Sequence, residues 1–153
     1  MKYYSSLWFH LRLFSKKCFN TAIILYFLNE FVFDIYVLSG SSMEPTFNRG
    51  NNTIVLIDKI TPLFRRGYNV NQIVSLKNPL DKSIKLCKRI TGIAGHCKRM
   101  LSGEVVTIPF NNYWVEGDNK SLSLDSRMFG PVNRDFIIGR VCLQLFPEIK
   151  WKF

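Results

Sequence analysis

The chain has 153 residues, of which 47% are hydrophobic and 21% charged. This is enough for one domain with a packed core and a short appendage, and it excludes both a fusion of two enzymes and a largely disordered chain. Lys and Arg number 21 against 11 Asp and Glu, for a formal net charge of +10, which favours anionic partners such as nucleic acid or lipid headgroups without choosing between them.

The N-terminal segment is basic and then apolar. Residues 1–17 contain Lys and Arg but no acidic residue, as is typical of a targeting segment. Residues 18–38 are mostly apolar, and as a helix they would span about 30 Å, the thickness of a bilayer core. We therefore predict a transmembrane helix over 18–38, with the basic segment on the cis side of the membrane and residues 39–153 on the trans side.

Two acidic residues complicate this span. A carboxylate near the bilayer centre costs about 3 kcal/mol, so Glu30 and Asp34 should lie toward one end of the helix, on the same face. A buried amphipathic helix of a soluble domain is the alternative. A cleaved signal peptide fits less well, because no small-x-small cleavage pattern follows the apolar run.

The sequence pattern of the remaining chain is typical of a β domain. Short runs of β-branched and apolar residues alternate with Gly, Pro and Asn, and long patterns of helical period are absent. We predict a mainly β fold, an open barrel or sandwich, forming one domain over 39–153. The predicted strands are 53–57, 72–76, 83–93, 104–108, 112–116 and 136–145.

The residue types that this sequence lacks exclude several kinds of catalytic site. The four cysteines form no CxxC pair and no Cys/His cluster at metal-ligand spacing, so we expect no metal and no cofactor. The only histidines are His10, in the basic segment, and His96, so a Ser/His/Asp triad could use only His96. A serine activated by a lysine is the arrangement left, and Ser42 and Lys88 are the natural candidates.

A lysine acts as a general base only when it is neutral, and its ordinary pKa near 10.4 forbids that at neutral pH. Burial in apolar surroundings can lower this pKa. In the KLCKRI strand, alternation places Lys88 on the same face as Leu86 and Ile90, while Lys85 and Arg89 lie on the other face. Lys88 is therefore the lysine expected to be desolvated, and Lys85 is expected to stay solvated.

Three segments together resemble the type I signal peptidases, and among them the mitochondrial inner membrane proteases. They are SGSSMEPTF (39–47), KLCKRITGIAGH (85–96) and EGDNKSLSLDSRMFGPV (116–132). The resemblance covers nearly the whole chain. The phrases IVSLKNP (73–79) and FGPV (129–132) favour one of the two subunit types of the mitochondrial enzyme.

The resemblance implies roles for residues that match the family's motifs. Ser42 would be the nucleophile, Lys88 the general base, and Ser123 the hydroxyl that orients the lysine. Asp125 and Arg127 would brace the site as an ion pair. Residues that match the motifs with a structural role are Met43, Pro45, Gly117, Asp118 and Asn119.

The resemblance also implies how substrate binds. An extended presequence would lie against strands beside the active site, with Ile84 and Leu86 flanking the cleft. One oxyanion donor of the bacterial relatives has no counterpart here. Those proteins have a serine two residues before the nucleophile, whose hydroxyl is a second donor to the oxyanion, and this chain has Gly40 at that position.

By this resemblance the chain is a membrane-anchored serine endopeptidase of the mitochondrial inner membrane, with residues 1–17 on the matrix side and the catalytic domain over 39–153 facing the intermembrane space. It would remove sorting presequences from precursor proteins, beside a related protease subunit and in contact with membrane lipid. A signal peptidase of bacterial, plastid or secretory membranes is the alternative within this class, and a non-catalytic membrane adaptor is the alternative outside it. Nucleic-acid binding is not expected, because the basic residues outside the N-terminal segment form no cluster interleaved with aromatics.

Overall fold

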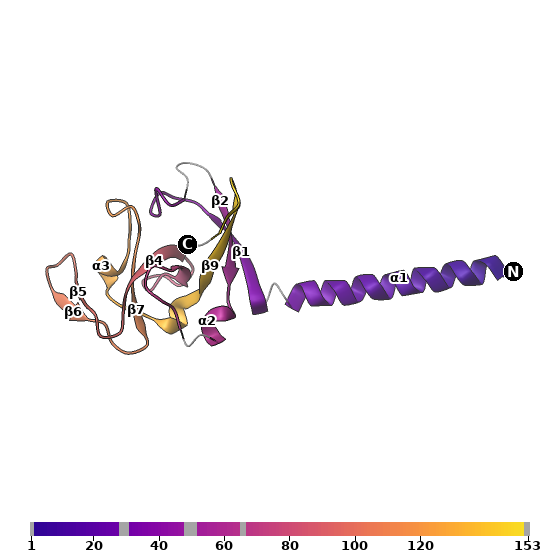
Figure 1. The fold of residues 1–153 in the computed structure, drawn as a ribbon, viewed down its shortest axis with the longest axis horizontal. Helices are drawn as coiled ribbons and strands as arrows, with labels where there is room; N and C mark the ends of the chain where they lie inside the picture. The colour runs from indigo at the N-terminus through magenta and orange to yellow at the C-terminus, as the bar shows by residue number, and fades with distance from the viewer. Residues whose placement is uncertain (1, 28–30, 48–51, 65–66, 152–153) are drawn as a thin grey trace.

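The computed structural model describes residues 2–27, 31–47, 52–64 and 67–151, with side chains from residue 14 onward in the first range and up to residue 26. A long helix, α1 (Lys2–Phe27), precedes a β domain and projects away from it, so that the N-terminus lies far from the domain and the C-terminus lies within it (Figure 1). The prediction of a mainly β domain is confirmed.

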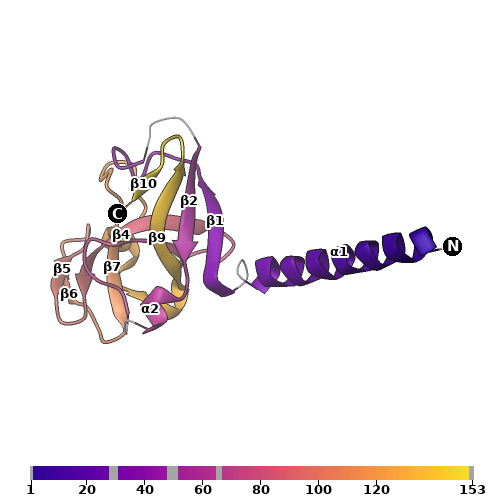
Figure 2. The ribbon, with the colours of Figure 1, turned by 45° about the vertical axis from the view of Figure 1, so that its right-hand side comes forward.

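One antiparallel sheet makes up most of this domain. Its strands run in the order β1-β2-β9-β3-β4-β7-β8, with β10 paired to β9, and the sheet curls as seen in Figure 2. A separate hairpin is formed by β5 (Cys97–Arg99) and β6 (Val105–Thr107). The strands of the main sheet are β1 (Phe33–Leu38), β2 (Thr53–Asp58), β3 (Ile73–Lys77), β4 (Lys85–Ile93), β7 (Asn112–Glu116), β8 (Val132–Asn133), β9 (Ile137–Phe146) and β10 (Lys150–Trp151).

Three short helical turns connect these strands: α2 (Thr61–Phe64), α3 (Ser126–Phe129) and the 3-10 turn η2 (Arg134–Phe136). All six predicted strands are present, with boundaries that differ by no more than two residues at either end. The four strands that the sequence analysis did not predict are β1 and the short β5, β8 and β10.

The helix predicted over 18–38 has different boundaries in the structure. Helix α1 includes the basic segment and ends at Phe27, whereas Phe33–Leu38 pairs with β2 as strand β1. Exposure alternates along β1, and the sequence FDIYVL is rich in the β-branched and aromatic residues that suit a strand. Asp34, in this strand, forms an ion pair with Lys59, with 3.4 Å between Asp34 Oδ2 and Lys59 Nζ. Glu30 lies outside the described residues.

Within the described residues, no helix combines the length and the apolar character that crossing a membrane requires.

The core consists of two apolar clusters on opposite faces of the central strands. Val74 and Leu76 of β3 contribute to one cluster, while Ile73 of the same strand contributes to the other, together with Cys87 of β4. Strand β3 is therefore buried on both faces, because the curled sheet covers it from two sides. Because β3 is buried on both faces, its pairing with β4 holds the residues of β4 in fixed positions.

The core predicts a contrast between two isoleucines in paired strands. Ile57 of β2 is 0% exposed and Ile35 of β1 is 56% exposed. Ile57→Ala should lower the free energy of unfolding by about 2–5 kcal/mol, because it leaves a cavity. Ile35→Ala should change it by about 0.5 kcal/mol or less. Denaturant unfolding measures both, and equal losses would contradict the packing described here.

Candidate active site

The nucleophile candidate lies in the loop that follows β1. Two buried side chains, Met43 and Phe47, insert into the core from this loop, and the Phe47 amide donates to the Met43 carbonyl at 3.1 Å. They hold Ser42, which is half-buried, at the wall of a groove. Pro45, in the same loop, is exposed.

Lys88 lies in the middle of β4 and is 2% exposed, so its amine is almost completely removed from solvent. Burial lowers the pKa of Lys88, and the negative charge of Asp125 opposes this only in part. The neighbours on its face behave as the alternation predicted: Ile90 is buried, and Lys85 on the opposite face is exposed. The structure therefore contains the desolvated lysine that the sequence indicated.

The segment Gly117 to Asn119 joins the Ser42 loop to the rest of the site. The Asn119 amide donates to the Ser42 carbonyl at 3.0 Å. A Cβ on Gly117 would lie 2.5 Å from that same carbonyl oxygen and 2.2 Å from Ser123 Oγ. Only glycine fits between these groups, which explains the glycine in the GDN triplet by close approach.

Asp118 ties three segments together. Arg89 Nε donates to Asp118 Oδ1 at 2.8 Å and Arg89 Nη2 donates to Asp118 Oδ2 at 2.7 Å, and the hydroxyl of Thr46 also donates to this carboxylate. Burial opposes ionisation of Asp118, but the hydrogen bonds from Arg89 and Thr46 outweigh it and lower the pKa of Asp118. Strand β4, the Ser42 loop and the GDN segment are thus held by one charged group.

Asp125 and Arg127 form a second bidentate pair beneath the site. Arg127 Nε donates to Asp125 Oδ1 and Arg127 Nη2 to Asp125 Oδ2, each at 2.9 Å. The Gly117 amide donates to Asp125 Oδ2 at 3.0 Å. Burial again opposes ionisation, but the hydrogen bonds from Arg127 and Gly117 lower the pKa of Asp125. The aspartate therefore stays charged while it positions the glycine that touches Ser42.

Ser123 is buried next to Gly117, and hydrogen bonding from its side chain is among the interactions that lower the pKa of Asp125. The neighbouring Ser126 is also buried, and its Oγ accepts from the Val115 amide at 2.9 Å.

A groove of about 290 Å³ begins at Ser42 and runs between β1 and β4. Of the two residues predicted to flank the cleft, Leu86 lines this groove, while Ile84 is not among its lining residues and is exposed. The sequence analysis did not identify several lining residues whose only signal was their place in a predicted apolar run or strand; they are Tyr36, Leu38, Ser75 and Cys87.

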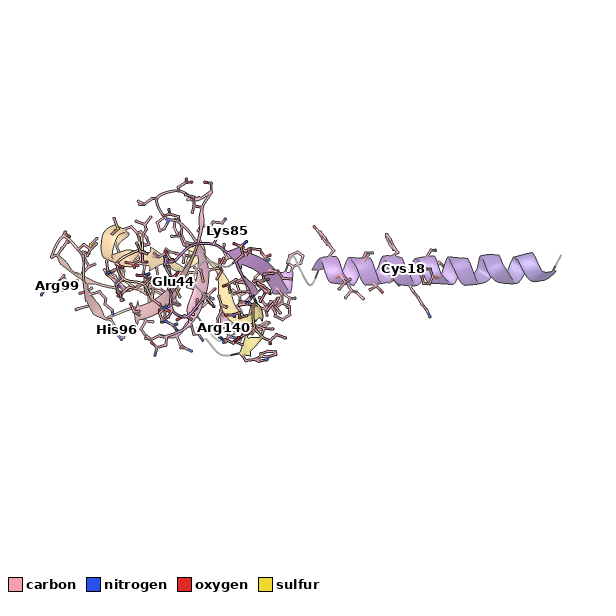
Figure 3. All side chains as sticks on the ribbon, turned by 90° about the horizontal axis from the view of Figure 1, so that it is seen from above. Cys18, Glu44, Lys85, His96, Arg99 and Arg140 are labelled. Atoms are coloured by element: carbon pink, nitrogen blue, oxygen red, sulfur yellow. The ribbon has the colours of Figure 1, made fainter. Side chains whose placement is uncertain are left out.

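Of the groups that could support other chemistry, His96 and Cys97 do not line this groove. His96 is exposed at the turn after β4, at the end of the domain away from α1 (Figure 3). Cys87 is buried and Cys97 exposed, and both are free thiols. In the described part of the chain, no three His, Cys, Asp or Glu side chains lie close enough together to hold a metal ion.

Comparison with known proteins decides the family. The family described as signal peptidase, peptidase S26, matches residues 11–106 and 97–146. The chain belongs to this family. Its members include a mitochondrial inner membrane protease subunit 1 from Schizosaccharomyces pombe, which is 35% identical over 133 residues, covering 85% of this chain and 84% of that protein.

Relatives of the second subunit type match as well. A mitochondrial inner membrane protease subunit 2 from Saccharomyces cerevisiae is 30% identical over 135 residues, covering 84% of this chain and 76% of that protein. The resemblance to the mitochondrial enzyme is therefore confirmed, and the preference of IVSLKNP and FGPV for subunit 2 is consistent with this family. As a signal peptidase family member, the chain is a peptidase by relationship.

We expect the buried amine of Lys88 to lower the free energy of unfolding at neutral pH. Since the folded state holds Lys88 with a lowered pKa, the unfolded state binds more protons between that value and 10.5, and stability should rise with pH across this window. Lys88→Met should raise the free energy of unfolding near pH 7 by about 0.5–2 kcal/mol. The gain should shrink toward pH 10.5.

Denaturant unfolding at several pH values measures this gain. Lys77→Met, at the exposed end of β3, is the matched control and should have little effect at any pH. A loss of stability in Lys88→Met at neutral pH would contradict the account of a desolvated amine.

Proposed function

We propose that the chain is a serine endopeptidase in which Ser42 is the nucleophile and Lys88 the general base. The observation that carries this proposal is the buried amine of Lys88, since burial favours the neutral form that a base requires. The contacts of Gly117 support it, because this glycine touches both the Ser42 carbonyl and Ser123, and it bonds to Asp125. Asp125 is in turn the main charge acting on Lys88.

The reaction begins when neutral Lys88 Nζ accepts the Ser42 hydroxyl proton, as Ser42 Oγ forms a bond to the scissile carbonyl carbon. The protonated Nζ then donates this proton to the leaving amine as the C–N bond breaks, which leaves an ester on Ser42. A water molecule gives a proton to Lys88 and attacks the ester, and Ser42 Oγ regains a proton as the acid product leaves. The Ser42 amide is suited to stabilise the oxyanion.

Positioning is the role of the remaining matched residues. The buried hydroxyl of Ser123, which lies against Gly117, would hydrogen-bond the Lys88 amine and fix its direction. The Asp125–Arg127 pair holds Gly117 and so the Ser42 backbone. The Arg89–Asp118 pair keeps β4 in register with the Ser42 loop. Such groups act through the orientation of the reacting pair, where small displacements cost large factors in rate.

The substrates we propose are precursor proteins with N-terminal presequences. The groove beside Ser42 is lined by residues of strands β1 and β4, and strand edges of this kind suit an extended peptide segment. Relatives named as subunits of one protease support a second, related subunit as a partner. Membrane lipid is the other partner, and no nucleic acid is involved.

The site of action we propose is the mitochondrial inner membrane, with the β domain facing the intermembrane space. Relatives that bear this location in their names support it. Helix α1 supports attachment to the membrane, because Phe14, Phe19 and Ile24 are exposed along it while no part of the β domain covers them (Figure 1). Lys16 and Lys17 are suited to anionic headgroups.

Loss of either member of the pair should abolish processing. Ser42→Ala and Lys88→Met should each lower kcat/KM for a presequence-bearing precursor by about 10³-fold or more. Membranes that carry each full-length variant at equal abundance provide the assay. Ser41→Ala and Lys77→Met are the matched controls and should process normally. Undiminished processing by Ser42→Ala or Lys88→Met would remove the pair from the chemistry and favour a non-catalytic adaptor.

Attachment through α1 can be tested by extraction of mitochondrial membranes at alkaline pH. The full chain should stay with the membrane pellet, and Ile24→Asp should shift a measurable fraction to the supernatant, because a charge replaces an apolar side chain on α1. Asn20→Asp adds the same charge at an already polar position and serves as control. Complete release of the unaltered chain would contradict attachment through α1.

A further inference from the structure

We propose that Lys85 and Tyr36 form a specificity site that binds an acidic side chain of the substrate about three residues from the scissile bond. This inference rests on the proposed endopeptidase function and adds a determinant of which precursors are cut. Among the described residues that line the groove beside Ser42, Lys85 is the one charged side chain.

Two unpaired strand edges border this groove. Strand β1 lies at an edge of the sheet, and in the described part of the chain it pairs with β2 alone. Strand β4 pairs with β7 only from Arg89 onward, so that Lys85 to Lys88 pair with β3 alone. The Ile84 carbonyl accepts from the Asn78 amide on the β3 side. By alternation, Lys85 and Cys87 direct their N–H and C=O groups toward the groove, where an extended peptide can bond to them.

A side-chain contact connects the two borders of the groove. Lys85 Nζ lies 4.3 Å from the centroid of the Tyr36 ring, which comes from β1. A cation over an aromatic face is held in place while its outer side stays open to an anion. In Figure 3, Lys85 lies on the side of the domain next to α1 and β1, away from His96 and Arg99.

The charge of Lys85 is available to a substrate. Hydrogen bonding to Tyr36 raises the pKa of Lys85, so that the amine is charged at neutral pH. Asp34 on the facing strand pairs with Lys59 Nζ at 3.4 Å, and its charge also acts on Lys85 and Tyr36. Among the described residues, no carboxylate lies within ion-pair distance of Lys85. A substrate carboxylate would supply the missing partner.

The position of the acidic residue follows from strand geometry. Lys85 precedes Lys88 by three residues, which in a strand is about 10 Å. A substrate peptide that binds as a strand at the edge of β4 rises by the same distance per residue as β4, so positions along the peptide match positions along β4. The side chain that meets Lys85 is therefore about three residues from the bond that Ser42 attacks.

The test is a comparison of Glu and Gln in the substrate. A cleavable precursor is made with Glu, and separately with Gln, at each of the four positions on both sides of the cut, and kcat/KM is measured with membranes that carry the full-length chain. We expect Glu to be favoured by about 10-fold at a single position three or four residues from the cut. Lys85→Met should remove this preference, and Lys85→Glu should reverse it so that Lys is favoured over Glu there.

Two controls separate this inference from the proposed function. Lys82→Met alters a lysine that lies over another ring, Phe136, outside the groove, and it should keep the Glu preference. If cleavage requires Ser42 and Lys88 but the Glu/Gln ratio is near one at every position, or is unchanged by Lys85→Met and Lys85→Glu, the specificity site is overturned while the function stands. If cleavage does not require Ser42, the proposed function itself fails.

Discussion

The burial of one amine is the constraint on which the rest of the site depends. An ammonium group inside an apolar sheet is costly, so the fold must supply a strand covered on both faces to keep Lys88 dry. The curled sheet does this by placing separate apolar clusters on the two sides of β3 and β4. A flat sheet with one solvated face would leave the same lysine exposed and charged.

The charged pairs around this amine serve a different purpose. Arg89–Asp118 and Asp125–Arg127 are both bidentate, and both reach the Ser42 loop through backbone groups of the Gly117 to Asn119 segment. Because Asp125 and Arg127 oppose each other in charge, the field at Lys88 is partly balanced and burial decides its pKa. The network therefore fixes the position of the segments around Lys88 without restoring the charge of its amine. Only a glycine at position 117 allows the segments to approach this closely.

Much of this arrangement was predictable from the sequence because it rests on alternation. The alternation in KLCKRI predicted a buried Lys88 and a solvated Lys85, and the six predicted strands are present. The run FVFDIYVL was misread as helix because apolar residues at nearly every position fit either period. Its partner strand β2, distant in sequence, makes it β1. The contacts of Lys85 with Tyr36 and of Thr46 with Asp118 join residues that are far apart in the sequence. No local pattern could therefore predict them.

The most direct test of the account is the ionisation of Lys88 itself. A pH titration of the lysine side-chain nitrogens by NMR in the full-length Ser42→Ala protein, assigned by comparison with Lys88→Met, reports this without depending on turnover. We predict that Lys88 loses its proton well below the ordinary lysine value of 10.5. A titration at or above 10.5 would show a charged amine in the folded protein and would contradict its role as the base.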